Sequence, residues 1–197
     1  MRRGAGRAYG ADDSREPVLI EDGQRLRFDG KGGAETLPDG SECPDEDVWL
    51  HLDYSSPHAY EWIKTSTLLP DGVRESLQGD SSRPKLVKAN GGMLLTLRCI
   101  NANEGERPDQ MVALRFFISD RLVVSTRRRR VHAVEGIVED LERHIGPLNT
   151  ADWLVDLCEH ITEQAGDYID ELQEQIALLE EHLLSDRHIH RSELADI

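Results

Sequence analysis

The sequence predicts a mixed α+β fold: a β-sheet body packed between helices, followed by long acidic amphipathic helices. Three observations predict this class. Strand-like apolar segments separated by turn residues recur between residues 24 and 126. After residue 130 the apolar residues recur with a helical period instead. The last quarter of the chain combines this helical pattern with a strong excess of acidic residues.

The body is expected to contain a succession of strands joined by turns. Residues 26–28 lead into the Gly-rich hairpin signal at 29–33, and residues 48–53 alternate with period two. Short connections between the later strands favour antiparallel pairing. These later strands are expected at residues 84–88, 93–100, 111–118 and 122–126.

Four helices are predicted around and after these strands. Ser56 as cap and Pro57 at the first helical position predict a short helix, and a second one is expected at 73–77. A third helix has Val134, Ile137, Val138 and Leu141 on one face and is predicted to end at Gly146-Pro147.

The fourth predicted helix runs from about residue 151 to 184 and would be roughly 50 Å long. That length is too great for a compact domain of this size. Its apolar residues are spaced 3.6 residues apart on average, the period of one helix face. They are Leu154, Leu157, Ile161, Ala165, Tyr168, Leu172, Ile176, Leu179 and Leu183.

These patterns divide the chain into four parts. Residues 1–17 are expected to be a flexible leader, 18–148 the α/β body and 149–186 the acidic helical appendage. Residues 187–197 are expected to begin a further helix. No stretch approaches the 18–20 apolar residues that cross a bilayer.

The net charge of the chain limits the kinds of partner that it can bind. The 197 residues carry a net charge of −15, which disfavours nucleic acid because binding to phosphates depends on cationic residues. A cation or a basic surface fits better. The run Arg127, Arg128, Arg129 and Arg130 is therefore interpreted as a solvated strand end, a counter-charge surface for the acidic helix or an anion site.

The main candidate site is a column of carboxylates on the long helix. Glu159, Glu163, Asp167 and Glu171 lie four residues apart and therefore share one helix face. Like charges at this spacing repel one another, and no Lys or Arg lies between Arg143 and Arg187. Two interpretations stay open: a solvated acidic face, or a face that binds cations or a basic surface. Hard cations such as Mg²⁺ prefer such oxygen ligands.

A second candidate metal site lies near the predicted end of the helix. His182, Asp186, His188 and His190 are ligand types that zinc accepts. Residues two apart in a helix point in different directions, so the spacing of the last two is not diagnostic. Exposed histidines at a helix junction are the alternative interpretation.

Neither disulfide bonds nor enzymatic chemistry is predicted. Cys43, Cys99 and Cys158 are odd in number and far apart, which favours buried thiols in a reducing compartment. The sequence contains no G-x-S-x-G, P-loop, H-E-x-x-H or G-x-G-x-x-G motif. We therefore expect a protein that is not an enzyme and has no tightly bound cofactor.

Several segments resemble the ZntB zinc transporters of the CorA superfamily, in the same order and with similar spacing. Together they span about residues 24–185. They are Trp49-Leu50-His51-Leu52-Asp53, Asp80-Ser81-Ser82-Arg83-Pro84-Lys85, Leu97-Arg98-Cys99-Ile100-Asn101, Arg107 to Arg115, Arg121 to Arg127 and Trp153-Leu154-Val155-Asp156.

This resemblance implies a CorA-type soluble domain at the cytoplasmic face of the inner membrane, in a homopentameric transporter. It implies Zn²⁺ or Mg²⁺ as the transported or regulatory ion, and a stalk helix leading into two membrane spans. The pore motif and the spans of that family are not in this sequence, so we expect a fragment that ends where the stalk begins. The function expected is assembly, vestibule electrostatics and ion sensing; the alternative is a stand-alone acidic regulatory or cation-binding module.

Overall fold

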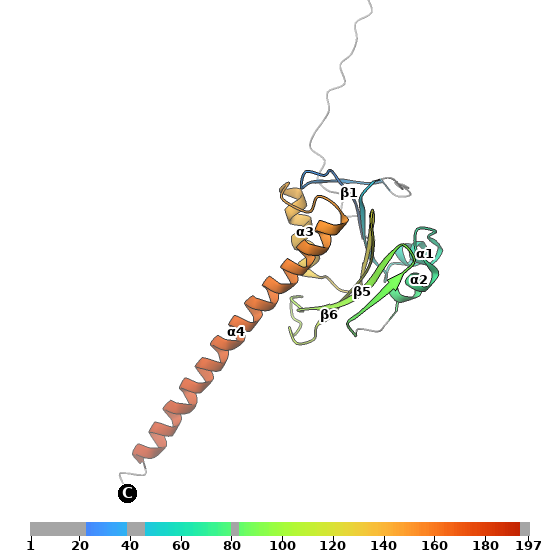
Figure 1. The fold of residues 1–197 in the computed structure, drawn as a ribbon. Helices are drawn as coiled ribbons and strands as arrows, with labels where there is room; N and C mark the ends of the chain where they lie inside the picture. Colours follow the sequence, from blue (N-terminus) through green and yellow to red (C-terminus); the bar gives the residue numbers. More distant parts are fainter. Residues whose placement is uncertain (1–22, 39–45, 80–82, 194–197) are drawn as a thin grey trace, which may run out of the picture.

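A seven-stranded mixed sheet forms the body of the protein, and helices cover both of its faces (Figure 1). The computed structural model describes residues 23–38, 46–79 and 83–193, with side chains described as far as residue 184. The predicted leader, residues 1–17, lies outside these ranges. Within them, the predicted α+β class is confirmed.

All but one of the strand pairs in the sheet are antiparallel. The exception is the central pair β3 and β7, which run parallel, with His51 beside Ser125 and Asp53 beside Arg127. The predicted hairpin at residues 29–33 joins β1 to β2. The strand order is β2 (Ala34–Thr36), β1 (Gly23–Phe28), β3 (Val48–Asp53), β7 (Leu122–Arg127), β6 (Val112–Ser119), β5 (Gly92–Cys99) and β4 (Lys85–Ala89).

One face of the sheet packs against two short helices, α1 (Pro57–Thr65) and α2 (Asp71–Leu77). Pro57 begins α1 as predicted, because its fixed φ suits the first helical turn and its missing N–H is not needed there. The predicted side-chain cap is wrong: the Ser56 side chain makes no capping hydrogen bond. Its backbone carbonyl instead accepts the N–H of Tyr60 at 2.9 Å.

The other face packs against α3 (His132–Glu142) and the first turns of α4 (Thr150–Glu193). Ala133, Val134, Ile137 and Leu141 of α3 are buried against the sheet. The helix ends at Glu142, a few residues before the Gly146-Pro147 stop that the sequence predicts.

An aromatic cluster fixes the start of α4 to the sheet. Trp153 is fully buried, with its ring centroid 5.3 Å from that of Trp49 and 5.2 Å from that of Phe116. Asn149 precedes the helix, and its Oδ1 accepts the backbone N–H groups of Ala151 and Asp152 at 2.9 and 3.0 Å. Such a cap satisfies donors that have no partner within the helix.

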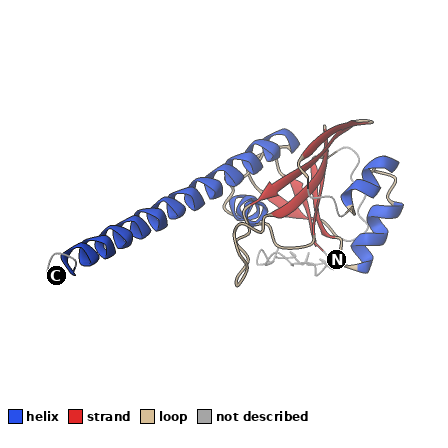
Figure 2. Cartoon of the chain, turned by 90° about the horizontal axis from the view of Figure 1, so that it is seen from below, coloured by secondary structure: helices blue, strands red, loops and turns tan. Residues whose placement is uncertain are grey.

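Beyond its first turns, α4 leaves the body and extends away from it (Figures 1 and 2). The helix has 44 residues and continues past the predicted end at residue 184. The boundary predicted between residues 186 and 187 falls inside this uninterrupted helix.

The apolar stripe predicted on α4 has two different environments. Leu157 is fully buried and Leu154 and Ile161 are half-buried, since they pack against the sheet and α3. From the middle of the helix onward the stripe is exposed, with Ile176 at 55% and Leu183 at 64%. The body therefore uses only the first third of an amphipathic helix.

We expect Gly92→Ala to be strongly destabilising because β6 passes too close to this glycine. A Cβ at Gly92 would lie 2.2 Å from the backbone oxygen of Ile118 and 2.9 Å from the ring of Phe117. Relieving such an overlap costs about 1–3 kcal/mol. Gly72→Ala in α2, where a Cβ meets nothing within 4 Å, is the control. It should raise stability slightly, and urea unfolding in which both variants match the unmodified protein would contradict the prediction.

Candidate functional site

The predicted carboxylate column begins on the solvent side of the packed first turns of α4 and continues onto the part of the helix that leaves the body. Glu159, Glu163, Asp167 and Glu171 are all exposed. Within the described part of the chain, none of the four forms an ion pair; Glu171 accepts a hydrogen bond from Gln175 at 3.1 Å. The structure therefore leaves an acidic face open to solvent, and cation binding by it stays a prediction.

The arginine run does not face this column. Arg129 Nη1 lies 2.6 Å from Glu106 Oε2, and Arg130 Nε lies 2.7 Å from Glu135 Oε1. Both partners belong to the body rather than to α4. Arg128 is exposed, and Arg127 lines a cavity described below. These contacts do not test whether the four arginines form an anion site or a counter-charge surface, which stays a prediction.

The predicted histidine site is only partly described. His182 is exposed on α4. Asp186, His188 and His190 lie within the bounds of the helix, but their side chains are outside the described ones. Among the described side chains, no three of His, Cys, Asp and Glu come together in a group that could hold a metal ion.

Polar groups also meet where α4 crosses α3, which the sequence analysis did not single out. His160 Nε2 lies 3.0 Å from Asp140 Oδ2, and the His160 ring covers Gly136, where a Cβ would approach it to 2.7 Å. Partial burial, and then the nearby Glu159, raise the pKa of Asp156. The first turns of α4 thus join the body through the hydrogen bond between His160 and Asp140 as well as through Trp153.

Cysteine placement corrects one expectation. Cys99 is buried in the sheet, and burial raises the pKa of its thiol to about 12. Cys158 is exposed on α4, so the interpretation of this residue as a buried thiol is wrong. The helical pattern predicted around Cys158 is correct, but Cys158 lies beside the packed apolar stripe of α4 rather than within it. Cys43 lies outside the described residues.

Neutralising the column should stabilise α4. Each like-charged pair four residues apart costs a helix about 0.2–0.5 kcal/mol. The triple variant Glu163→Gln, Asp167→Asn and Glu171→Gln removes three such pairs, so we expect slower amide hydrogen exchange along α4, equivalent to about 1 kcal/mol. The gain should shrink in 1 M salt, which screens exposed charges. Unchanged exchange at low salt would show that the column is not self-repelling.

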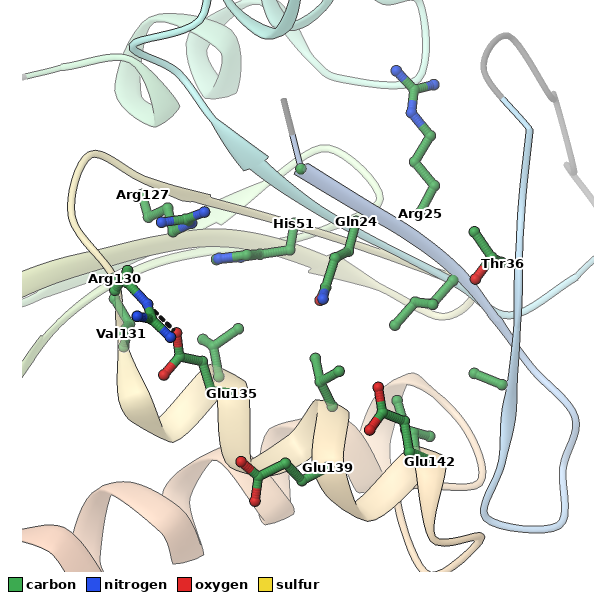
Figure 3. Close-up of a pocket in the computed structure, with 16 residues that line it drawn as sticks. Gln24, Arg25, Thr36, His51, Arg127, Arg130, Val131, Glu135, Glu139 and Glu142 are labelled. Atoms are coloured by element: carbon green, nitrogen blue, oxygen red, sulfur yellow. Dashed lines mark hydrogen bonds and ion pairs between the residues drawn. The ribbon is translucent and has the colours of Figure 1, made fainter. Parts of the chain in front are cut away.

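A cavity lies between the sheet and α3 (Figure 3). It has a volume of about 600 Å³. Strands β1, β3 and β7 form its roof, and α3 forms its floor. Gln24, His51 and Arg127 come from the roof, whereas Glu135, Glu139 and Glu142 come from α3.

His51 is the most perturbed group in this cavity. It is 5% exposed, and its Nδ1 lies 2.7 Å from Ser125 Oγ. The same oxygen accepts the Trp49 indole N–H at 2.9 Å. Burial, and then the charge of Arg127, lower the pKa of His51 to about 3. The imidazole is therefore neutral at pH 7.

Sequence reasoning did not find this arrangement, although a signal was present. The alternation of residues 48–53 places Trp49 and His51 on the same face of a strand. A histidine on the inward face of a strand needs a buried hydrogen-bond partner, because its ring nitrogens lose their contact with water. The partner, Ser125, is 74 residues away and becomes a neighbour only through the parallel pairing of β3 with β7.

Comparison with known proteins places the chain in a family. Residues 45–197 match the sequence model of the family described as "CorA-like Mg2+ transporter protein". The chain belongs to the CorA family. The resemblance predicted from the sequence segments is thereby confirmed.

Two relatives carry the name zinc transport protein ZntB. The Enterobacter protein is 46% identical over 163 residues, which cover 82% of this chain and 50% of the relative. The Cronobacter sakazakii protein is 44% identical over 160 residues, 81% of this chain and 49% of the relative. This CorA-family chain thus spans about half the length of these relatives.

Solved structures show the same fold. Full-length CmaX superposes with a TM-score of 0.75 at 30% identity, covering 86% of this chain and 53% of CmaX. The ZntB cytoplasmic domain from Vibrio parahaemolyticus gives 0.70 at 24% identity, covering 79% of this chain and 64% of that domain. The CorA magnesium transporter from Methanocaldococcus jannaschii gives 0.66 at 13% identity, covering 82% and 51%. No helix in the described ranges of this chain combines the length and apolarity needed to cross a bilayer.

Proposed function

We propose that this chain is the cytosolic part of a CorA-family divalent-cation transporter, and that zinc is the ion it serves. The observation that carries this proposal is the 46% identity to a ZntB protein over 82% of the chain. Zinc rather than magnesium is chosen because both of these relatives are named for zinc. The proposal assigns no catalytic role and no tightly bound cofactor.

The exposed acidic face of α4 suggests how this part contributes. Four carboxylates at successive four-residue steps, without a Lys or Arg between Arg143 and Arg187, create a negative field beside the helix. A field of one sign raises the local concentration of counter-ions. We propose that α4 concentrates divalent cations near the transport path, and that ion occupancy of the column reports the cytosolic cation level.

Assembly is the second part of the proposal. The distal part of α4 exposes a row of apolar side chains that includes Leu172, Ile176 and Leu179. Exposed apolar surface of this kind marks an interaction site. We propose that the chain works within a homopentamer at the cytoplasmic face of the inner membrane. Contact with the membrane itself would then be made by other parts of the transporter.

A chimera tests the transport role directly. We expect an Enterobacter ZntB in which this chain replaces the matching segment to carry Zn²⁺ into liposomes. Flux should fall when Glu159, Glu163, Asp167 and Glu171 are neutralised together, because the counter-ion concentration beside α4 falls with them. The matched control neutralises Asp47, Glu75, Glu104 and Asp120, acidic residues of the body that, like the column, have no ion-pair partner among the described residues. Radioactive zinc uptake provides the measurement.

Two outcomes would contradict the proposal in different ways. A chimera that assembles in the membrane but carries no zinc would contradict the role as part of a transporter. It would favour the alternative, a stand-alone acidic regulatory or cation-binding module. Equal flux in both neutralised variants would leave the transport role but remove the role of the column.

A further inference from the structure

The cavity between the sheet and α3 has a polar end that the transport proposal does not use. Figure 3 shows the His51 ring and the Arg127 guanidinium converging at this end, with the Gln24 amide pointing into the same space. Ser125 binds Nδ1 of His51, so the ring nitrogen Nε2 is the one left toward the cavity. Among the described residues Arg127 has no ion-pair partner, in contrast to Arg129 and Arg130.

The middle of the cavity is apolar. Leu26 of β1 and Val131, Val134 and Val138 of α3 line it. Leu26, Val131 and Val134 also belong to the buried core, so this wall is rigidly packed rather than assembled from loose surface side chains. Cavities of this size with an apolar wall and a few convergent polar groups are typical of small-molecule sites.

The polar end also holds the Glu135 carboxylate, which is paired with Arg130 at 2.7 Å, so Arg127 is left as the positive charge there. Figure 3 places Glu142 at the end of the cavity remote from Arg127, and that end is therefore negative. Arg25 contributes only its backbone side to the lining, because its guanidinium lies over the Trp62 ring on the other face of the sheet, 5.9 Å from the centroid. A ligand with one negative end fits this polarity, whereas a second negative end would meet Glu142.

We propose that this cavity is a binding site for a small aliphatic monocarboxylate. The carboxylate lies against the Arg127 guanidinium and the Gln24 amide, with His51 Nε2–H as a further donor. The aliphatic body lies along Leu26, Val134 and Val138. Ser125 acts as a positioning residue. Its hydroxyl can donate to His51 Nδ1 at 2.7 Å, which is closer than its other acceptor, the Leu50 carbonyl at 3.4 Å, and this keeps the ring proton on Nε2.

Proton nuclear magnetic resonance of the 197-residue chain tests this proposal with hexanoate as the probe. We expect saturable shifts of the His51 Cε1–H signal and of the Val134 and Val138 methyl signals. Hexylamine has the same body with the opposite charge and should give none of these shifts. Adipate, which adds a second carboxylate, should bind more weakly than hexanoate, and inorganic phosphate should not compete with it.

Variants separate the site from unspecific binding. Arg127→Gln should weaken hexanoate binding about tenfold or more, because a charge-assisted hydrogen bond is lost. Arg129→Gln, at an arginine paired with Glu106 outside the cavity, should leave binding unchanged. Val138→Phe fills the cavity without changing its charge and should abolish binding while the thermal transition persists.

Absence of saturable shifts with hexanoate would overturn the proposal. Equal binding of hexylamine, or an unchanged affinity in both Arg127→Gln and Val138→Phe, would also overturn it. None of these results depends on zinc transport. A failure of the binding site would therefore not contradict the transport role, and a failure of the transport role would not contradict the binding site.

Discussion

Replacing Trp153 with alanine should lower the free energy of unfolding by about 3–5 kcal/mol, the range for a fully buried tryptophan. Trp153 has no exposed surface and packs between Trp49 and Phe116 in the core that joins α4 to the sheet. Truncation removes both aromatic contacts and leaves a cavity that the rigid sheet cannot fill. Urea unfolding followed by circular dichroism measures the loss.

The matched control lies on the same helix. Leu179 is 61% exposed, so Leu179→Ala should change the free energy of unfolding by no more than about 0.5 kcal/mol. If Trp153→Ala costs as little as Leu179→Ala, the aromatic cluster does not stabilise the body.

A second large effect concerns pH. The folded protein binds a proton at His51 only near pH 3, whereas an unfolded histidine does so near pH 6.5. Between these values the unfolded state binds more protons, so stability must fall as the pH falls. From pH 7 to pH 4 this one residue should remove about 3 kcal/mol of stability.

The variant His51→Asn isolates this contribution. Asparagine can keep a hydrogen bond to Ser125 but does not titrate, so the difference in stability between the two proteins should shrink or reverse as the pH falls to 4. Urea unfolding at several pH values gives the comparison. His182→Asn, at an exposed histidine, should retain the full pH dependence of the unmodified protein. Parallel pH profiles for the unmodified protein and His51→Asn would show that His51 is not a buried neutral histidine.

Local patterns were sufficient to predict most of the fold. The alternation of Val48–Asp53 and the Gly-rich turn before Ala34 depend on neighbours in sequence, and both are confirmed. The parallel pairing of β3 with β7 was not predicted from the residues, because it joins segments about 74 residues apart. The helical period gave the apolar side of α4 correctly. It could not show that the distal half of this side is uncovered, since a period carries no information about a packing partner.

The candidate site was predicted less completely. Helical spacing places Glu159 and Glu163 on one exposed face, as expected. Whether the arginine run would balance that face depended on tertiary contacts, and Arg129 and Arg130 lie against body carboxylates instead. The cavity around His51 was missed because its lining comes from two distant stretches, residues 23–51 and 127–142, which no local motif connects.

The single helix α4 also acts as a lever. Its 44 residues correspond to about 66 Å at 1.5 Å per residue, but only the first turns contact the sheet and α3. The portion after His160 alone would extend about 50 Å. A tilt of about 10° at the His160 contact would therefore displace the far end by about 9 Å, on the basis of that rise per residue. Small changes in packing between α3 and α4 therefore become much larger movements at the tip, so the packing of the base determines where the far end of α4 is held.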